Sequence, residues 1–275
     1  MKALHWLYSA MATMDTSSPS TSSTRTNNNA IVILGLNAAL QKRMVLGDDK
    51  TLIPGNVHRA TAVQTGVGGK GQDVAIAMNC LNMKNLQLAQ FLGQGAAGDA
   101  VHQMLKDTLA GPSQSSSSSS LSLTVRVQSE LRTCTSIVTS SETTEIIEPS
   151  GTIQAEEWKE LIHTLKTQHQ TPVDAVCCMG SLPPGCPADS YAECYAPIAG
   201  PQTLCVNDSV AGLQPLLAKI VGSTVVKLNA SELCKLVRCA TSTATTTSSE
   251  RAVVAQQYLT HAIKRFVSKS SPPAA

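Results

Sequence analysis

The sequence predicts an α/β fold in which a parallel β-sheet is covered by helices on both faces. Short apolar runs of strand length alternate along the chain with segments in which apolar residues recur every three or four positions. This alternation is typical of βαβ units, which place successive strands in parallel within one sheet. A length of 275 residues suits one main α/β domain, which can bury roughly 70–75% of its unfolded surface.

The first half of the chain supplies the opening strands and helices. Residues 30–36 are rich in isoleucine, valine and leucine, which predicts a buried first strand. Apolar residues then follow at helical spacing, which predicts a helix whose buried face is formed by Val74, Ala77, Met78 and Leu81. Residues 86–92 predict the next strand, and residues 97–109 predict the next helix.

A lid is predicted from the middle of the chain. Residues 123–127, 132–139 and 143–148 are short β-branched segments with few residues between them. Because this spacing leaves no room for crossover helices, it is typical of antiparallel strands. We therefore expect a small antiparallel β lid, with strands within about 43–63 and 123–148.

The second half of the chain returns to the α/β rhythm. A helical stripe around Trp158 is followed by three apolar runs, residues 175–179, 203–206 and 224–228, which predict further parallel strands. In open sheets of this kind, ligands bind beyond the carboxyl ends of the strands. Residues 180–185 follow one such end, so we expect them to line a ligand site.

Several segments are predicted to lie outside the folded core. Residues 1–29 are rich in serine, threonine and asparagine, which predicts either a disordered tail or an organelle-targeting segment. A run of six serines within residues 112–122 predicts a disordered insertion, because it offers nothing to bury. We expect one domain over residues 30–267, followed by a tail over residues 268–275.

Composition excludes several classes of partner. The 21 Lys and Arg residues nearly balance the 19 Asp and Glu residues, so the chain lacks the basic character that nucleic-acid binding requires. No apolar stretch approaches the roughly 20 residues that span a membrane. Nine cysteines without a CxxC pair predict reduced thiols in an intracellular protein. We expect a small-molecule ligand and a cytoplasmic location, with a plastid or a mitochondrion as the alternatives.

The segment from Gly66 to Gly71 is a glycine-rich junction that leads into the first predicted helix. Gly66, Gly68 and Gly71 match the dinucleotide pattern GxGxxG, but the acidic residue expected about 20 positions later is absent from residues 75–98. A nucleotide P-loop needs Ser or Thr after its lysine, whereas Lys70 is followed by glycine. The junction still suits an anion, because glycine exposes backbone N–H groups at a helix N-terminus and Lys70 adds a positive charge.

Further motifs follow one another in order along the chain. They are Asn37–Leu40 (compared with NPAL), Gly68–Ala75 (GGKGxNVA), Arg132–Thr133 (TR), Thr144–Glu145 (TE), Gly180–Gly185 (SGSLPPG) and Lys227–Glu232 (KPNxxE). In type and order they resemble the hexose-phosphate branch of the PfkB, or ribokinase-like, family of carbohydrate kinases. The resemblance implies a three-layer fold with a lid, and transfer of the γ-phosphoryl group of ATP to a sugar phosphate with Mg²⁺ as cofactor.

The resemblance also implies roles for particular residues. It places the sugar phosphate against residues of the first motifs, the lid and one strand end: Asn37, Gln41, Gly68, Gly69, Lys70, Gly71, Asp73, Arg132, Glu145, Gly180 and Ser181. It implies that Asn229 and Glu232 hold Mg²⁺ through water, and that Lys227 contacts the nucleotide.

The same residues allow plainer interpretations. Lys70 can be a solvated loop lysine. Arg132 and Glu145 can form an ordinary cross-strand charge pair within the lid. Asn229 can be the N-cap of a helix, with Glu232 as the N3 residue of a capping box.

The sequence departs from the family at several positions. Gln41 stands where the family has Asp, and Asp73 stands where it has Asn. The Asp of a later DTSG segment falls at Asn207 or, one residue on, at Asp208. These changes affect the recognition of sugar hydroxyls, because a carboxylate accepts two strong hydrogen bonds from a diol whereas an amide has one acceptor oxygen.

The catalytic GAGD segment of the family does not occur after Glu232. Gly95–Asp99 is similar to it but lies in the N-terminal half, where we interpret it as the start of a helix. We therefore assign no catalytic residue and expect a C-terminally truncated fold. The alternative function is a non-catalytic relative that binds a sugar phosphate or forms a homodimer through its lid.

Overall fold

The computed structural model describes most of the predicted domain, namely residues 30–47, 51–83, 85–110, 122–169 and 172–233. The predicted tails and the serine run of the predicted insertion lie outside these ranges. Among the helices within these ranges, none is long and apolar enough to cross a membrane.

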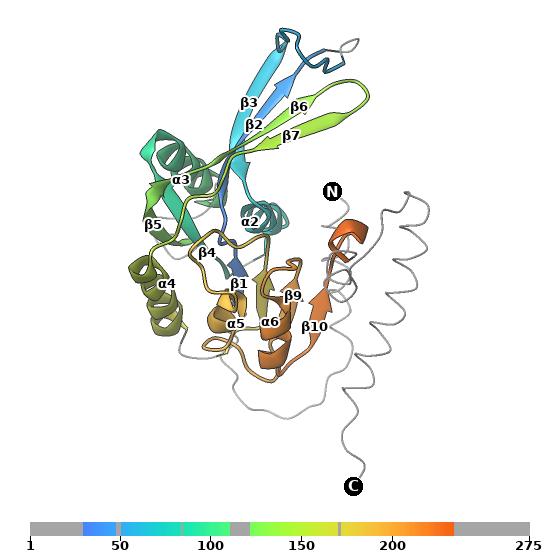
Figure 1. Ribbon diagram of the computed structural model, residues 1–275. Coiled ribbons are helices and arrows are strands. Elements are labelled where there is room, and N and C mark those ends of the chain that lie inside the picture. Colours follow the sequence, from blue (N-terminus) through green and yellow to red (C-terminus); the bar gives the residue numbers. More distant parts are fainter. Residues whose placement is uncertain (1–29, 48–50, 84, 111–121, 170–171, 234–275) are drawn as a thin grey trace.

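Six parallel strands form the central sheet, in the spatial order β10-β9-β8-β1-β4-β5 (Figure 1). They are β1 (Ile31–Leu34), β4 (Leu86–Gln94), β5 (Ser122–Glu130), β8 (Ala175–Cys178), β9 (Leu204–Asn207) and β10 (Thr224–Val226). Ile33, for example, pairs in parallel with Leu88 on β4 and with Cys177 on β8. The parallel sheet predicted from the α/β alternation is confirmed.

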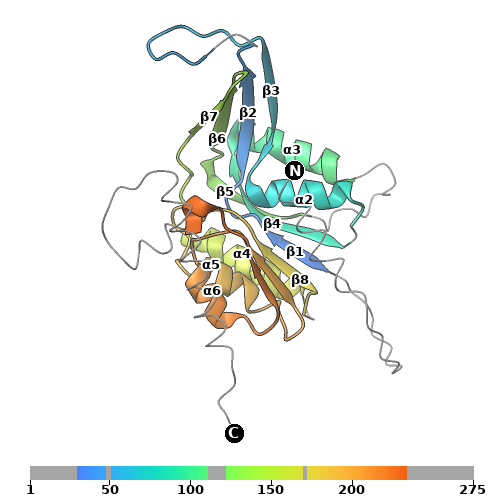
Figure 2. The same cartoon turned by 90° about the vertical axis from the view of Figure 1, so that its right-hand side faces the viewer.

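Helices cover both faces of this sheet (Figure 2). One face carries α2 (Lys70–Cys80) and α3 (Gly95–Ala110), and the other carries α4 (Ala155–Gln168), α5 (Ser190–Tyr195) and α6 (Leu213–Lys219). Neighbouring side chains of β1 enter different cores: Ile33 packs in the cluster that holds Ala75 and Leu105, whereas Leu34 packs in the cluster that holds Leu161. A strand buried on both faces needs apolar residues at every position, which explains the continuous run in β1.

The buried face of α2 differs from the predicted one. It is formed by Gly71, Gln72, Ala75 and Met78. Leu81, which the apolar spacing placed on that face, is 47% exposed. Packing at the start of the helix determines which face is buried. Gly71 lies against Gly35, and a Cβ on Gly71 would be 2.3 Å from the Cα of Gly35. The face that contains Gly71 and Gln72 is therefore turned inward.

A second sheet projects from the central sheet as the lid, with the strand order β3-β2-β6-β7 (Figures 1 and 2). Its strands are β2 (Ala39–Val45), β3 (Ala62–Gly68), β6 (Thr133–Val138) and β7 (Thr143–Ile147). The prediction of an antiparallel lid is wrong at its centre, where β2 and β6 pair in parallel. β2 follows β1 and β6 follows β5, so both strands leave the carboxyl end of the parallel sheet in the same direction. Each then turns back into an antiparallel partner, β3 or β7.

The bounds of the lid also differ from the prediction. β2 and β3 extend beyond residues 43–63 at both ends, and β5 belongs to the central sheet, where Val125 pairs in parallel with Phe91. β5 is an edge strand in which apolar residues alternate with polar ones such as Thr124. Alternation of this kind is typical of a half-exposed antiparallel strand. That pattern is the reason for the wrong prediction of residues 123–127.

Candidate functional site

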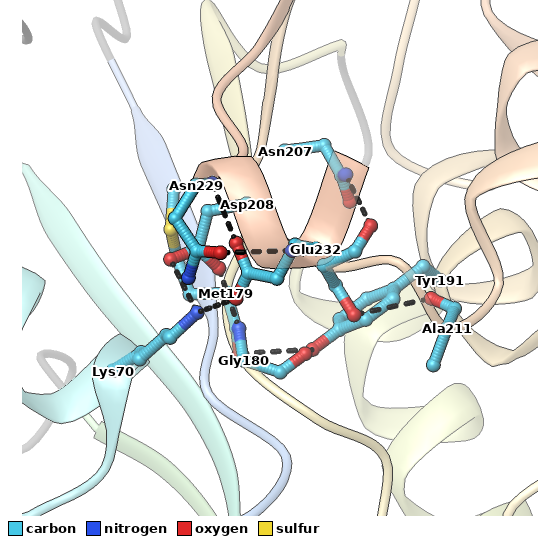
Figure 3. Close-up of polar contacts among 10 residues, drawn as sticks. Lys70, Met179, Gly180, Tyr191, Asn207, Asp208, Ala211, Asn229 and Glu232 are labelled. Atoms are coloured by element: carbon cyan, nitrogen blue, oxygen red, sulfur yellow. Dashed lines mark hydrogen bonds and ion pairs between the residues drawn. The ribbon is translucent and has the colours of Figure 1, made fainter. Parts of the chain in front are cut away.

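Lys70 is the first residue of α2, and its side chain reaches two carboxylates (Figure 3). Its Nζ lies 3.3 Å from Oδ2 of Asp208 and 3.2 Å from Oε1 of Glu232. Burial acts to lower the pKa of Lys70, but the two carboxylates outweigh it and raise the pKa above its usual value. We call these three residues the ion cluster. Lys70 is thus not the solvated loop lysine of the plainer interpretation.

The glycine run before Lys70 is a strand end followed by a helix cap. Gly68 closes β3, and Gly69 is the N-cap of α2 with a φ angle of 115°. Glycine alone adopts this φ readily. Gly71 then packs on Gly35, directly after β1. These contacts bring the N-terminus of α2 to the carboxyl end of β1, as the prediction of an anion-binding junction requires.

Asp208 is a member of the ion cluster that the sequence offered only as an alternative to Asn207 for the Asp of the DTSG segment. It follows β9, and its Oδ1 accepts a hydrogen bond of 2.8 Å from the backbone N–H of Gly180. Its side chain is 11% exposed, so this carboxylate is held in place. Its position directly after an apolar strand is a signal for a site residue. The carboxyl ends of parallel strands lie at one edge of the sheet, where ligands bind.

Asn229 and Glu232 form a reciprocal helix cap. The Glu232 N–H donates to Oδ1 of Asn229, and the Asn229 N–H donates to Oε2 of Glu232, both at 2.8 Å. The interpretation of this pair as a capping box is confirmed. Burial acts to raise the pKa of Glu232, but the Asn229 N–H and the Lys70 ammonium outweigh it and lower the pKa. The exposed Lys227 precedes this cap.

Gly180 and Ser181 connect the ion cluster to the base of the lid. The hydroxyl of the buried Tyr191 donates to the carbonyl oxygens of Met179 and Gly180, at 2.9 Å each, and fixes this strand end. Ser181 is exposed, and its Oγ accepts a hydrogen bond of 3.0 Å from Nδ2 of Asn37. Two predicted sugar-site residues from motifs that are 144 positions apart in sequence therefore meet.

Arg132 lies between β5 and β6 and points toward the chain after β1. Its Nη2 donates to the carbonyl oxygen of Asn37 at 3.1 Å, and its Nε lies 3.4 Å from that of Ala38. Among the ion pairs of the described residues, none joins Arg132 to Glu145, so the predicted cross-strand pair is not formed. Arg132 and Asn37 line a small cleft beyond the carboxyl ends of β1, β4 and β5.

The remaining predicted substrate residues are not members of the ion cluster. Gln41 lies on β2 within the lid, and its Nε2 donates to Oγ of Ser136 at 2.8 Å. Glu145 is exposed on β7, opposite Ser136 in the ladder. Asp73 is exposed in the first turn of α2, where the helix dipole favours a carboxylate.

Gln72 is a residue that the sequence pattern missed. Its fully buried side chain donates from Nε2 to the carbonyl oxygen of Gly35 at 2.7 Å and to Oε1 of Gln90 at 2.9 Å. Gln90 in turn donates to Oγ1 of Thr124 at 3.0 Å. This buried network ties the first turn of α2 to β1, β4 and β5, and so holds the glycine junction in place.

In the ion cluster, two carboxylates share one ammonium. These groups converge from α2, from the end of β9 and from the helix start after β10. Within the described residues, no group of three or more His, Cys, Asp or Glu is placed to hold a metal ion. Mg²⁺ keeps most of its water and takes few protein oxygens, so the two carboxylates could serve as its ligands only in place of their contacts with the Lys70 ammonium.

Comparison with known proteins gives a consistent set of relatives. No family model matches the chain. A tagatose-6-phosphate kinase from Staphylococcus epidermidis is 28% identical over 183 residues, which cover 66% of this chain and 54% of that protein. The protein of that name from a second strain is 27% identical over the same length. The chain thus spans about half the length of the curated relatives that it matches.

Solved structures give the same answer at the level of the fold. Phosphofructokinase-2 from Escherichia coli, in complex with substrates and products, has a TM-score of 0.62 at 21% identity, with 85% of this chain and 69% of that chain covered. The chain is similar in sequence to tagatose-6-phosphate kinases and in fold to phosphofructokinase-2. A ribokinase from Thermotoga maritima has a TM-score of 0.55 at 15% identity, with 83% of this chain and 68% of that chain covered. The predicted ribokinase-like fold is confirmed.

Proposed function

We propose that this chain forms the acceptor side of an ATP-dependent sugar-phosphate kinase. The observation that carries the proposal is the position of Lys70, at a glycine-capped helix N-terminus beside the carboxyl ends of the parallel strands. Such a position favours an anion. The name of the curated relatives, tagatose-6-phosphate kinase, supports a sugar phosphate as that anion.

The acceptor would bind between Lys70 and the base of the lid. Lys70 would hold its phosphate, and Asn37 and Ser181, already hydrogen-bonded to each other, would turn toward its hydroxyl groups. Arg132, at the cleft beside Asn37, would supply a second positive charge. The lid strands that carry Gln41 and Glu145 would cover the sugar from above.

The donor side would begin at the segment after β10. Lys227 would contact the nucleotide. Asn229 and Glu232 would hold Mg²⁺ through water, together with Asp208, the other carboxylate of the ion cluster. An ion held by these residues would supply positive charge close to the transferring phosphoryl group. The residues present fit that ion, because two carboxylates anchored by backbone N–H groups each direct one oxygen at the same point, where the Lys70 ammonium lies in the structure.

A second candidate is a non-catalytic protein that binds a sugar phosphate. It requires only the acceptor-side residues from Asn37 to Ser181, all of which belong to the described ranges. The geometry of the acceptor side is the same under both proposals. They differ in whether a hydroxyl bound there is phosphorylated.

The lid would also mediate homodimer formation. Its outer strands carry exposed apolar side chains, with Val63 on β3 at 54% exposure and Ile146 and Ile147 on β7 at 57% and 56%. Side chains of this size on an uncovered sheet edge favour association with another surface. Solved neighbours include a tetrameric form of phosphofructokinase-2 from Escherichia coli.

Binding and turnover measured on the same protein test both proposals. Calorimetric titration with tagatose 6-phosphate and fructose 6-phosphate in the presence of Mg²⁺ is expected to show binding. Lys70→Met is expected to weaken that binding about tenfold or more, because a charge-assisted hydrogen bond is lost. Lys159→Met is the control, since this lysine is 74% exposed on α4.

The outcome with ATP separates the two candidates. Phosphorylation of a bound sugar phosphate assigns the kinase, and binding without turnover assigns the non-catalytic relative. If neither sugar phosphate binds, or if Lys70→Met and Lys159→Met bind equally well, the acceptor site is not at Lys70.

A further inference from the structure

The two carboxylates of the ion cluster are held by the main chain, so that one oxygen of each faces Lys70. Oδ1 of Asp208 accepts from the Gly180 N–H, which leaves Oδ2 at 3.3 Å from the Lys70 Nζ. Oε2 of Glu232 accepts from the Asn229 N–H, which leaves Oε1 at 3.2 Å from the same nitrogen. Figure 3 shows both carboxylates turned toward Lys70.

This arrangement opposes anion binding by Lys70. Two of its three N–H groups are directed at carboxylates, and the ion cluster as a whole carries one positive and two negative charges. A phosphate that approaches Lys70 would meet a net negative charge at short range, where the interaction is only partly screened. Lys70 can therefore serve a phosphate well only after the carboxylates gain another positive partner.

We propose that Lys70 couples the binding of a divalent cation to the binding of the sugar phosphate. A divalent cation taken up by Asp208 and Glu232 releases Lys70 to the sugar phosphate, and without the cation the two carboxylates hold Lys70 back. This inference rests on the proposed acceptor function. Each ligand must then raise the affinity for the other by the same factor, because binding free energies are linked reciprocally.

The side chains are suited to this exchange. The Lys70 side chain is 45% exposed and sits on a flexible four-carbon stem, so its ammonium can move toward a ligand. The side chains of Asp208 and Glu232 are 11% and 21% exposed and are anchored by backbone N–H groups. The carboxylates therefore stay in place for a cation while the lysine moves. Their oxygens are the ligand type that Mg²⁺ prefers.

Two amide variants separate the effect of the negative charge from the effect of the backbone hydrogen bond. In Asp208→Asn and Glu232→Gln, the side-chain carbonyl oxygen can still accept from the Gly180 or Asn229 N–H, while the negative charge is removed. Glutamine is also accepted at the N3 position of a capping box. The matched control is Glu156→Gln, which removes a carboxylate that is 82% exposed on α4.

The experiment is a calorimetric titration of sugar phosphate, with and without Mg²⁺ and without nucleotide. Tagatose 6-phosphate and fructose 6-phosphate are the probes. We expect wild type and Glu156→Gln to bind at least about fivefold more tightly with Mg²⁺, a factor typical of linked sites. Asp208→Asn and Glu232→Gln are expected to bind the sugar phosphate tightly without Mg²⁺. Addition of Mg²⁺ is expected to change their affinity for the sugar phosphate little.

A second titration uses Mg²⁺ alone and does not depend on the identity of the sugar. Lys70→Met removes the ammonium that competes for the carboxylates and keeps the aliphatic stem. It is expected to bind Mg²⁺ at least about fivefold more tightly than wild type. Lys159→Met is expected to leave Mg²⁺ binding unchanged.

The outcomes separate the coupling from the acceptor site. Sugar-phosphate binding that Mg²⁺ does not affect in wild type, or an unchanged Mg²⁺ affinity in Lys70→Met, overturns the coupling and leaves the acceptor site standing. Absence of sugar-phosphate binding in every variant and condition overturns the acceptor site, and the coupling with it.

Discussion

Close contacts between main-chain segments place the charged groups of the site. Gly71 touches Gly35, and Gly180 lies beside the stem of Lys70, where a Cβ would be 3.5 Å from the Cβ of the lysine. Glycine permits these approaches because it adds no side-chain atoms. As a result, the Lys70 ammonium reaches Asp208 from another segment of the chain.

A substitution at Gly71 is expected to be costly at the residue scale. A Cβ there would lie 2.3 Å from a backbone Cα of Gly35, which has no flexible side chain to move aside. We expect Gly71→Ala to lower the free energy of unfolding by about 1–3 kcal/mol, measured by denaturant titration, as for other overpacked sites. Gly66→Ala is the control, since no atom lies within 4 Å of its Cβ position. Equal stability of the two variants would contradict this close packing.

At the scale of elements, the lid is an extension of the central sheet. β2 and β6 continue the chain from β1 and β5, and the parallel pair that they form carries one antiparallel strand on each side. The edge strands of the lid are therefore β3 and β7. Arg132, at the base of the lid, lines the cleft beyond the central strands.

The exposed residues of β7 provide a test of lid association. We expect wild type to form a dimer in light scattering coupled to size-exclusion chromatography. Ile146→Lys is expected to shift it to the monomer, because a charge would be placed in the interface. Val221→Lys adds the same charge at a site that is 64% exposed and outside the lid, and is expected to remain dimeric. A monomeric wild type, or equal dissociation of both variants, would exclude dimer formation through the lid.

At the scale of the whole molecule, two apolar cores on opposite faces of one sheet support the site at its carboxyl edge. The core beside α4 includes Leu161 and Leu165, and the core beside α3 includes Leu105, all of them buried. Around these cores, polar groups connect the layers at their ends. His169, at the C-terminal end of α4, hydrogen-bonds with Gln87 on β4.

Titration of His169 is expected to make global stability depend on pH. Burial lowers its pKa below the ordinary value of 6.5. The unfolded chain then binds the proton more readily, so the stabilisation is present above pH 6.5 and is lost as the pH falls through the lower, folded-state pKa. We expect His169→Gln to lose less unfolding free energy than wild type between pH 7.5 and pH 5, measured by denaturant titration. Parallel curves for the two proteins would show that His169 does not contribute.

The site was predictable from sequence only in part, and particular residues show why. The GGKG run and the Asn229 and Glu232 pair were recognisable because each is local. Four consecutive residues join the end of β3 to the first turn of α2, and three positions separate the members of the helix cap. Gln72 was missed, and Asp208 was not separated from Asn207, because their roles depend on partners that are distant in the sequence. The lid topology was missed for the same reason, since the pairing of β2 with β6 depends on where β1 and β5 end.

By itself, the sequence determined the layers of this protein and the chemical types gathered in its motifs. Apolar periodicity and glycine positions act over a few residues, so they are readable without the fold. The tertiary structure alone decided which charges meet. Lys70 and Glu232 are 162 positions apart, and their contact exists because parallel strands deliver the following segments to one edge of the sheet.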